Sequence, residues 1–150
     1  MTDTDRVLLT AAVLSSLAVA TFAWKVLRTD VGDPDRLIGE LRLSQWGAAL
    51  LAGVAGVPVG LALLSPLAAT AGLEAALGVI IIGAAGLILQ RDPRDALALV
   101  AGGFILHALI DLAHRPGWLS QDLAPHSYVA GCATYNVCLA ALCFAVRRRP

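Results

Sequence analysis

Five long apolar runs divide this sequence, and they limit what the chain can fold into more than any other feature does. A helix needs about 20 residues to cross the hydrocarbon core of a membrane, and each run is close to that length. Within a run the apolar residues are continuous and do not alternate with polar ones, so membrane-spanning strands are not expected. The share of hydrophobic residues, 58%, is also higher than in typical soluble domains. The runs cover residues 7–24, 46–64, 72–90, 96–114 and 126–146.

The predicted fold class is therefore all-α. We expect a polytopic transmembrane helical bundle of five helices that forms a single domain over residues 1–150, because a chain of this length has room for one domain. Membrane lipids are the expected surroundings, and a homo-oligomer or a larger membrane complex stays open. Nucleic acid is not an expected partner, since Lys occurs once and no basic stripe runs beside aromatic residues.

The distribution of Lys and Arg predicts the orientation of the helices. With five crossings, nine of the 11 Lys and Arg residues fall on one side of the membrane and two on the other. The side rich in positive charge is cytoplasmic by the positive-inside rule. We therefore expect the N-terminus outside and the C-terminus in the cytoplasm. The leader Met1–Arg6 carries two Asp and one Arg, which is atypical of a secretory signal, so the first helix is expected to remain uncleaved.

The connection between the first two runs shows the pattern of a short helix. Asp33-Pro34 is typical of a helix start, with Pro at the first helical position. Leu37, Ile38 and Leu41 would then share one face. We expect an interfacial helix over residues 34–44. Three of its charged residues, Arg36, Glu40 and Arg42, are expected to form a solvated face.

The three cysteines all lie in the last apolar run. Cys132, Cys138 and Cys143 are six and five positions apart, so no CxxC spacing for metal or redox chemistry is present. We expect them to act as small apolar packing residues.

A group of ionisable residues stands out within the predicted spans. His107, Asp111 and His114 are four and three positions apart, so they share one face of the fourth helix. Such groups cost several kcal/mol inside a membrane unless they are paired or solvated, and by default they indicate function. Glu74 and His126 begin neighbouring runs at the same, extracytoplasmic, end. These residues are expected to converge on one outward-opening pocket.

A metal site is the sharpest hypothesis for this group. Two imidazoles and a carboxylate suit Zn²⁺ or non-haem Fe. His107 and His114 would be ligands, and Asp111 either a third ligand or the acceptor that orients an imidazole. Glu74 or His126 would supply the remaining ligand. His126 points to the opposite side of its helix from the other polar residues of the fifth run.

A metal with an open position would support hydrolytic chemistry, or oxidative chemistry with iron. Glu74 is then the candidate general base, and Tyr135 the candidate donor to a developing oxyanion. The substrate would be lipid-like.

Three alternatives remain open. The pocket could bind or transport a cation or another small ligand without catalysis, although the inner half of the fourth run offers no polar relay for a conducting route. Two histidines could ligate haem, which requires them at matching depth. The chain could also be a structural subunit in which His107 and Asp111 form an intrahelical hydrogen bond.

The last third of the chain contains a distinctive pattern of small and polar residues. It reads His107-x3-Asp111-x2-His114-Arg-Pro-Gly, followed by Pro125-x-Ser127-x3-Gly131-Cys132. This pattern resembles a family of small bacterial integral membrane proteins of unknown function, in which Asp tends to stand in the place of Asn136. The resemblance implies a multi-pass location in the bacterial cytoplasmic (inner) membrane and a shared polar pocket, with no particular activity.

Overall fold

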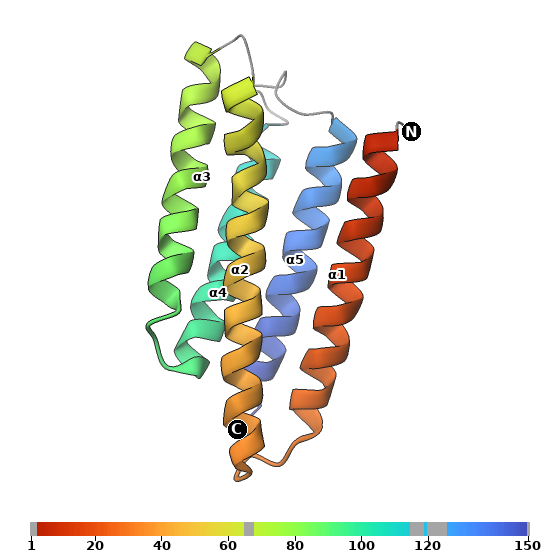
Figure 1. Cartoon of the computed structure of the whole chain (residues 1–150), viewed down its shortest axis with the longest axis vertical. Helices are drawn as coiled ribbons and strands as arrows, with labels where there is room; N and C mark the ends of the chain where they lie inside the picture. Colours follow the sequence, from red (N-terminus) through yellow and green to blue (C-terminus); the bar gives the residue numbers. More distant parts are fainter. Residues whose placement is uncertain (1–2, 65–67, 115–118, 120–125, 150) are drawn as a thin grey trace.

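The computed structural model describes residues 3–64, 68–114, 119 and 126–149, without the side chains of residues 3–5, 8, 64, 68–71, 126 and 127. Over this part of the chain the structure is all-helical, which confirms the predicted fold class. The five helices (Figure 1) are α1 (Asp3–Arg28), α2 (Pro34–Leu64), α3 (Ala68–Ile88), α4 (Pro93–Ala113) and α5 (His126–Arg148).

The helices lie side by side along the long axis of the molecule, and consecutive helices run in opposite directions (Figure 1). α4 packs most extensively against α5, and α2 against α3. α1 packs mainly against α5, whereas α3 meets α4 through a smaller contact. The ends of α2 and α4 therefore lie at the same end of the bundle as the starts of α3 and α5.

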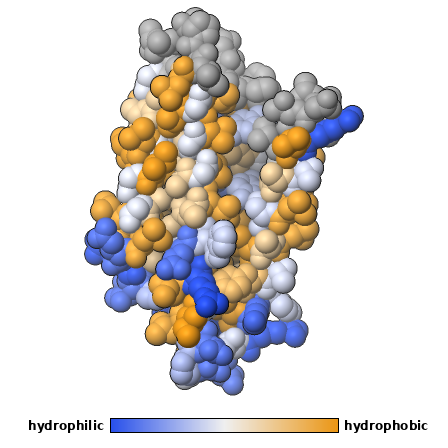
Figure 2. All heavy atoms as spheres, in the orientation of Figure 1, coloured by the Kyte–Doolittle hydropathy of each residue, from blue (hydrophilic) through white to orange (hydrophobic). Residues whose placement is uncertain are grey.

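Four helices are long and apolar enough, by length and composition, to cross a membrane, as a multi-pass membrane protein requires. α3 contributes a shorter apolar stretch among the described residues, Gly72–Ile88. Large apolar side chains cover much of the outer surface, and hydrophilic residues gather at the end where α1 ends and α2 begins (Figure 2). The four qualifying segments are Leu9–Arg28, Pro34–Leu63, Pro93–Ala113 and Tyr128–Arg148.

A glycine sets the close approach of α2 and α3. A Cβ atom added at Gly78 would lie 2.7 Å from the carbonyl oxygen of Ala55, which is too close for any side chain. Small residues let helix backbones approach in this way within a membrane, where packing drives association. This contact lies close to Pro58 of α2, and both Gly78 and Pro58 line the pocket described below.

The structure corrects the expectation for the first connection. The segment 34–44 is not a separate interfacial helix but the first part of α2, which continues without a break to Leu64. The expected solvated face is also wrong for two of its three charged residues, because Arg36 and Glu40 are 2% and 1% exposed. They are buried because they bond to each other and to neighbouring helix ends. Arg42 is exposed, as expected.

Candidate metal centre

Two polar pairs meet across the contact between α4 and α5. His107 and Asp111 are one turn apart on α4, and Cys132 and Asn136 are one turn apart on α5, so each pair shares a helix face. His107, Asp111 and Asn136 are buried, and Cys132 is partly buried. The antiparallel packing of the two helices thus gathers four polar side chains inside the bundle.

Three of these side chains offer donor atoms to a common point. One ligand atom each from His107, Asp111 and Cys132 lies within 4.8 Å of the other two. His107 Nδ1 is 3.5 Å from Asp111 Oδ2. An imidazole nitrogen, a carboxylate oxygen and a thiolate are the donor types that bind Zn²⁺ and related metals. The group could therefore hold a metal ion.

The amide of Asn136 lies among these three donor atoms. Its Nδ2 is 3.2 Å from Asp111 Oδ2, 3.4 Å from His107 Nδ1 and 3.5 Å from Cys132 Sγ. An amide nitrogen carries two N–H groups, so it cannot donate fully to three neighbours. Within the described part of the chain, Asn136 Oδ1 is buried and has no hydrogen-bond partner. The three neighbouring atoms therefore compete for two N–H groups, whereas a cation placed among them could bind all three at once.

A small pocket of about 20 Å³ lies beside His107 and Asp111, between α2, α3 and α4. Glu74 and His114 line the same pocket, and His114 Nε2 is 3.5 Å from Glu74 Oε1. A single water molecule needs about 10–15 Å³ of such volume. The pocket therefore accepts water or a small ion but has no room for a larger molecule.

His114 takes a position different from the one expected of a ligand beside His107. α4 ends at Ala113, and His114 caps it. His114 Nδ1 lies 3.0 Å from the carbonyl oxygen of Ile110 and 3.2 Å from that of Asp111. These bonds hold the ring at the helix end, with Nε2 toward Glu74. The predicted trio on α4 thus lines one pocket but has different polar partners: His107 and Asp111 meet Asn136 of α5, and His114 meets Glu74 of α3.

The other predicted site residues lie elsewhere. The Tyr135 hydroxyl is 3.0 Å from Ser15 Oγ on α1, and Tyr135 does not line the pocket. His126 begins α5, but its side chain lies outside the described residues.

The sequence analysis missed two members of the centre. From the sequence, Cys132 is expected to be a packing residue, and Asn136 is noted as a departure from a family pattern. One signal was available: Cys132 and Asn136 have the same four-residue spacing as His107 and Asp111. Two such pairs on consecutive antiparallel helices can face each other, as they do here.

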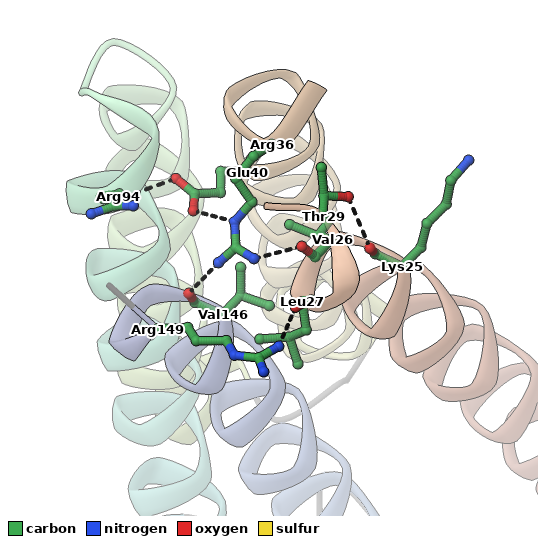
Figure 3. Close-up of polar contacts among 9 residues, drawn as sticks. All are labelled: Lys25, Val26, Leu27, Thr29, Arg36, Glu40, Arg94, Val146 and Arg149. Carbon is green, nitrogen blue, oxygen red and sulfur yellow. Dashed lines mark hydrogen bonds and ion pairs between the residues drawn. The ribbon is translucent and has the colours of Figure 1, made fainter. Parts of the chain in front are cut away.

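A second buried polar cluster lies at the opposite end of the bundle (Figure 3). Arg36 Nε donates to Glu40 at 2.7 Å, and the guanidinium also donates to the carbonyl oxygens of Val26 and Val146. These carbonyls belong to the last turns of α1 and α5, where backbone acceptors lack partners within their own helix. Arg94 of α4 completes the cluster, 3.2 Å from the second oxygen of Glu40. Arg36 of α2 thus forms hydrogen bonds that link α1, α2 and α5.

A comparison with protein-family models, curated proteins and solved structures finds no match for this chain. The resemblance to small bacterial membrane proteins stays a prediction.

Proposed function

We propose that this protein is an integral membrane protein that binds a transition-metal ion between α4 and α5. The ligands are His107 Nδ1, the Asp111 carboxylate and Cys132 Sγ. The observation that carries the proposal is the convergence of these three donor atoms, within 4.8 Å of one another, from two helices. Donors bound to a tetrahedral Zn²⁺ at about 2.0–2.3 Å lie roughly 3.5 Å apart, so small side-chain rotations suffice to close the site.

The electrostatics of the cluster support a cation. A carboxylate buried among helices is costly unless a positive charge or several hydrogen bonds compensate it. Asp111 is 6% exposed, and the donor that faces it from α5 is the amide of Asn136, at 3.2 Å. A divalent ion at the centre would offset the carboxylate and a thiolate at once. Zn²⁺ and Fe²⁺ suit this mixture of nitrogen, oxygen and sulfur donors.

The fourth ligand is Asn136 in this proposal. Amide oxygen and nitrogen have nearly the same shape, so a half-turn about the last side-chain bond exchanges them. That rotation would bring Oδ1, which has no partner among the described residues, to the three donor atoms. Four protein ligands make a closed centre of the kind that stabilises structure or stores an ion.

Ion binding is better supported than chemistry on a lipid-like substrate. The pocket beside the centre holds about 20 Å³, which accommodates water or an ion but no acyl chain or head group. Ion binding is also better supported than conduction. Beyond His107, the buried residues of α4 are apolar, and Phe104, Val100 and Leu97 are each 0% exposed.

The test is the metal content of the detergent-purified full chain, measured by elemental analysis. We expect about one zinc or iron per chain, lost in His107→Ala, Asp111→Asn and Cys132→Ser. Cys138→Ser is the matched control, since Cys138 lies on the same helix but is exposed. The control should retain the metal. A wild-type chain that takes up no zinc or ferrous iron, even when these ions are added, would contradict the proposal.

We also propose the orientation with the N-terminus outside, five crossings and a bacterial cytoplasmic (inner) membrane location. α3 spans 21 residues, or about 32 Å of helix, which matches the hydrocarbon core. Reporter fusions at each loop test the topology. A reporter that is active only outside the cytoplasm should be active when it is fused after Leu64. A reporter that is active only in the cytoplasm should be active when it is fused after Ile88.

A further inference from the structure

Positive charge is concentrated where α1 and α5 end. Both helices finish with basic residues in the last turn, and no Asp or Glu occurs in segments 7–28 and 126–149. α1 packs against α5, and both helices finish at the same end of the bundle (Figure 1). The α1–α5 basic end consists of five exposed residues: Lys25, Arg28, Arg147, Arg148 and Arg149.

The start of α4, at the same end of the bundle, has a different charge pattern. Arg91 and Arg94 are exposed there, but the exposed acids Asp92 and Asp95 directly follow them in the sequence. On the α1 side, the next acid is Asp30, which lies beyond the end of the helix. The charges at the start of α4 therefore largely cancel, whereas those of the α1–α5 basic end add up.

The backbone at the end of a helix normally repels an anion, because its last carbonyl groups carry partial negative charge. Here guanidinium groups already cover three of these carbonyls (Figure 3). Arg36 donates to the carbonyl oxygens of Val26 and Val146. Arg149 donates to that of Leu27. The arrangement reduces the negative field of both helix ends and leaves the other four cations of the α1–α5 basic end available.

Each helix also places an arginine over an exposed aromatic ring. The Arg28 guanidinium lies 4.6 Å from the centre of the Trp24 ring, and that of Arg148 lies 4.9 Å from the centre of the Phe144 ring. The two aromatic residues are 58% and 40% exposed. Trp in particular is enriched at the boundary between membrane and water. An arginine held at this depth can still bind a phosphate through two parallel N–H groups.

We propose that the α1–α5 basic end binds the head group of an anionic phospholipid. The proposal rests on the membrane location proposed above and does not depend on the metal centre. Arg28 and Arg148 contact the phosphate in this proposal. Lys25 adds positive charge nearby, and its side chain extends away from the Arg36 network (Figure 3).

A lipid fits this place because the cations lie at the edge of an apolar surface. Large apolar side chains are exposed farther along the same two helices, among them Leu14, Leu17 and Val137. Acyl chains can lie on this surface while the phosphate stays at the helix ends. Each Lys or Arg close to an anionic membrane surface strengthens binding by about fivefold.

The experiment measures fluorescence quenching of the full chain in vesicles, with Trp24 as the reporter. The other two tryptophans, Trp46 and Trp118, are replaced by Phe. The vesicles are mixtures of phosphatidylglycerol and phosphatidylcholine in which one lipid or the other carries bromine, which quenches a nearby indole. We expect phosphatidylglycerol to be favoured around Trp24 by about fivefold, the effect of one Lys or Arg.

Variants test whether the preference comes from the α1–α5 basic end. The double variant Arg28→Gln/Arg148→Gln should lower the preference to less than about twofold, because it removes both arginines that stand over rings. Arg28→Lys/Arg148→Lys keeps the charge and should retain most of the preference. Arg42→Gln/Arg91→Gln is the matched control, since it removes two exposed arginines from other helices at the same end of the bundle. It should behave as wild type.

Three results would overturn the lipid site. They are equal quenching by the two brominated lipids, an unchanged preference in Arg28→Gln/Arg148→Gln, and an equal loss of preference in the control variant. Displacement of brominated phosphatidylglycerol by soluble glycerol phosphate would also overturn it, because the site would then bind free phosphate. A chain that inserts into neither kind of vesicle would contradict the membrane location as well. The metal content of the same samples reports on the metal centre separately.

Discussion

The bundle contains two buried polar clusters, one at each end, and they differ in how their charges are matched. At the end shown in Figure 3, the Arg36 guanidinium donates to Glu40 and to two helix carbonyls, so positive charge meets acceptors on every side. At the other end, polar atoms of His107, Asp111 and Cys132 all lie within 3.5 Å of one amide nitrogen, that of Asn136. The first cluster is complete by itself. The second contains no Lys or Arg, and it is therefore the one that we assign to a ligand.

The largest expected effect comes from breaking the complete cluster. Arg36→Met leaves Glu40 buried with Arg94 as its only cationic partner among the described residues, and it leaves the carbonyls of Val26 and Val146 without the guanidinium. Removing one partner of a buried ion pair typically destabilises a protein by about 3–5 kcal/mol. Thermal unfolding in detergent should show this loss. The double variant Arg36→Met/Glu40→Gln should recover part of it, and Arg42→Gln, at an exposed position, should change little. Stability equal to wild type in Arg36→Met would remove the contrast between the clusters.

Removing a charge from the second cluster should have the opposite effect on the stability of the protein. Asp111→Asn removes a buried charge that faces the His107 imidazole but no Lys or Arg in the centre, so the metal-free protein should be as stable as wild type or more stable by about 1 kcal/mol. Metal binding should be lost. Unfolding with and without added zinc measures both. A strongly destabilised metal-free Asp111→Asn protein would show that the second cluster is also complete without an ion.

Substitutions of Asn136 sharpen the assignment of the fourth ligand. Asn136→Leu keeps the volume but removes the oxygen, and it should weaken Zn²⁺ binding by about 10–100-fold. Asn136→Asp keeps an oxygen donor and should bind at least as tightly as wild type. Competition with a zinc-sensitive dye gives the affinities. Tighter binding in Asn136→Leu would mean that the amide only competes with the ion for the three donors.

The smallest effect is expected at Tyr135. Its hydroxyl bonds to Ser15 at 3.0 Å and lies away from the pocket. Tyr135→Phe should cost about 1 kcal/mol, the usual net value of one hydrogen bond, and it should leave metal content unchanged. Unfolding and elemental analysis on the same sample check both. Loss of metal in Tyr135→Phe would extend the second cluster to α1.

The sequence was sufficient to predict the helices but only part of the candidate metal centre. Apolar runs of membrane length predicted all five helices, and Asp33-Pro34 predicted a helix start at the right residue, although of a separate short helix rather than of α2. Spacing on one helix also predicted that His107 and Asp111 share a face. It could not predict that this face meets α5, the contact that brings Cys132 Sγ within 4.8 Å of ligand atoms of His107 and Asp111. Nor could it predict the burial of Arg36, because its two carbonyl partners come from helix ends 10 and 110 residues away in the chain.

The hydrogen bonds of Arg36 become possible one after another as the chain is synthesised. The partners of its guanidinium do not emerge from the ribosome together: Val26 is made before Arg36, Glu40 directly after it, and Val146 only when α5 is nearly complete. A nascent chain of the first two helices therefore already contains every residue needed for the Arg36–Glu40 and Arg36–Val26 bonds. Insertion of the last helix supplies the remaining acceptor. If Arg36, which is synthesised early, binds the end of α5, insertion of this last helix is the step that completes the bundle.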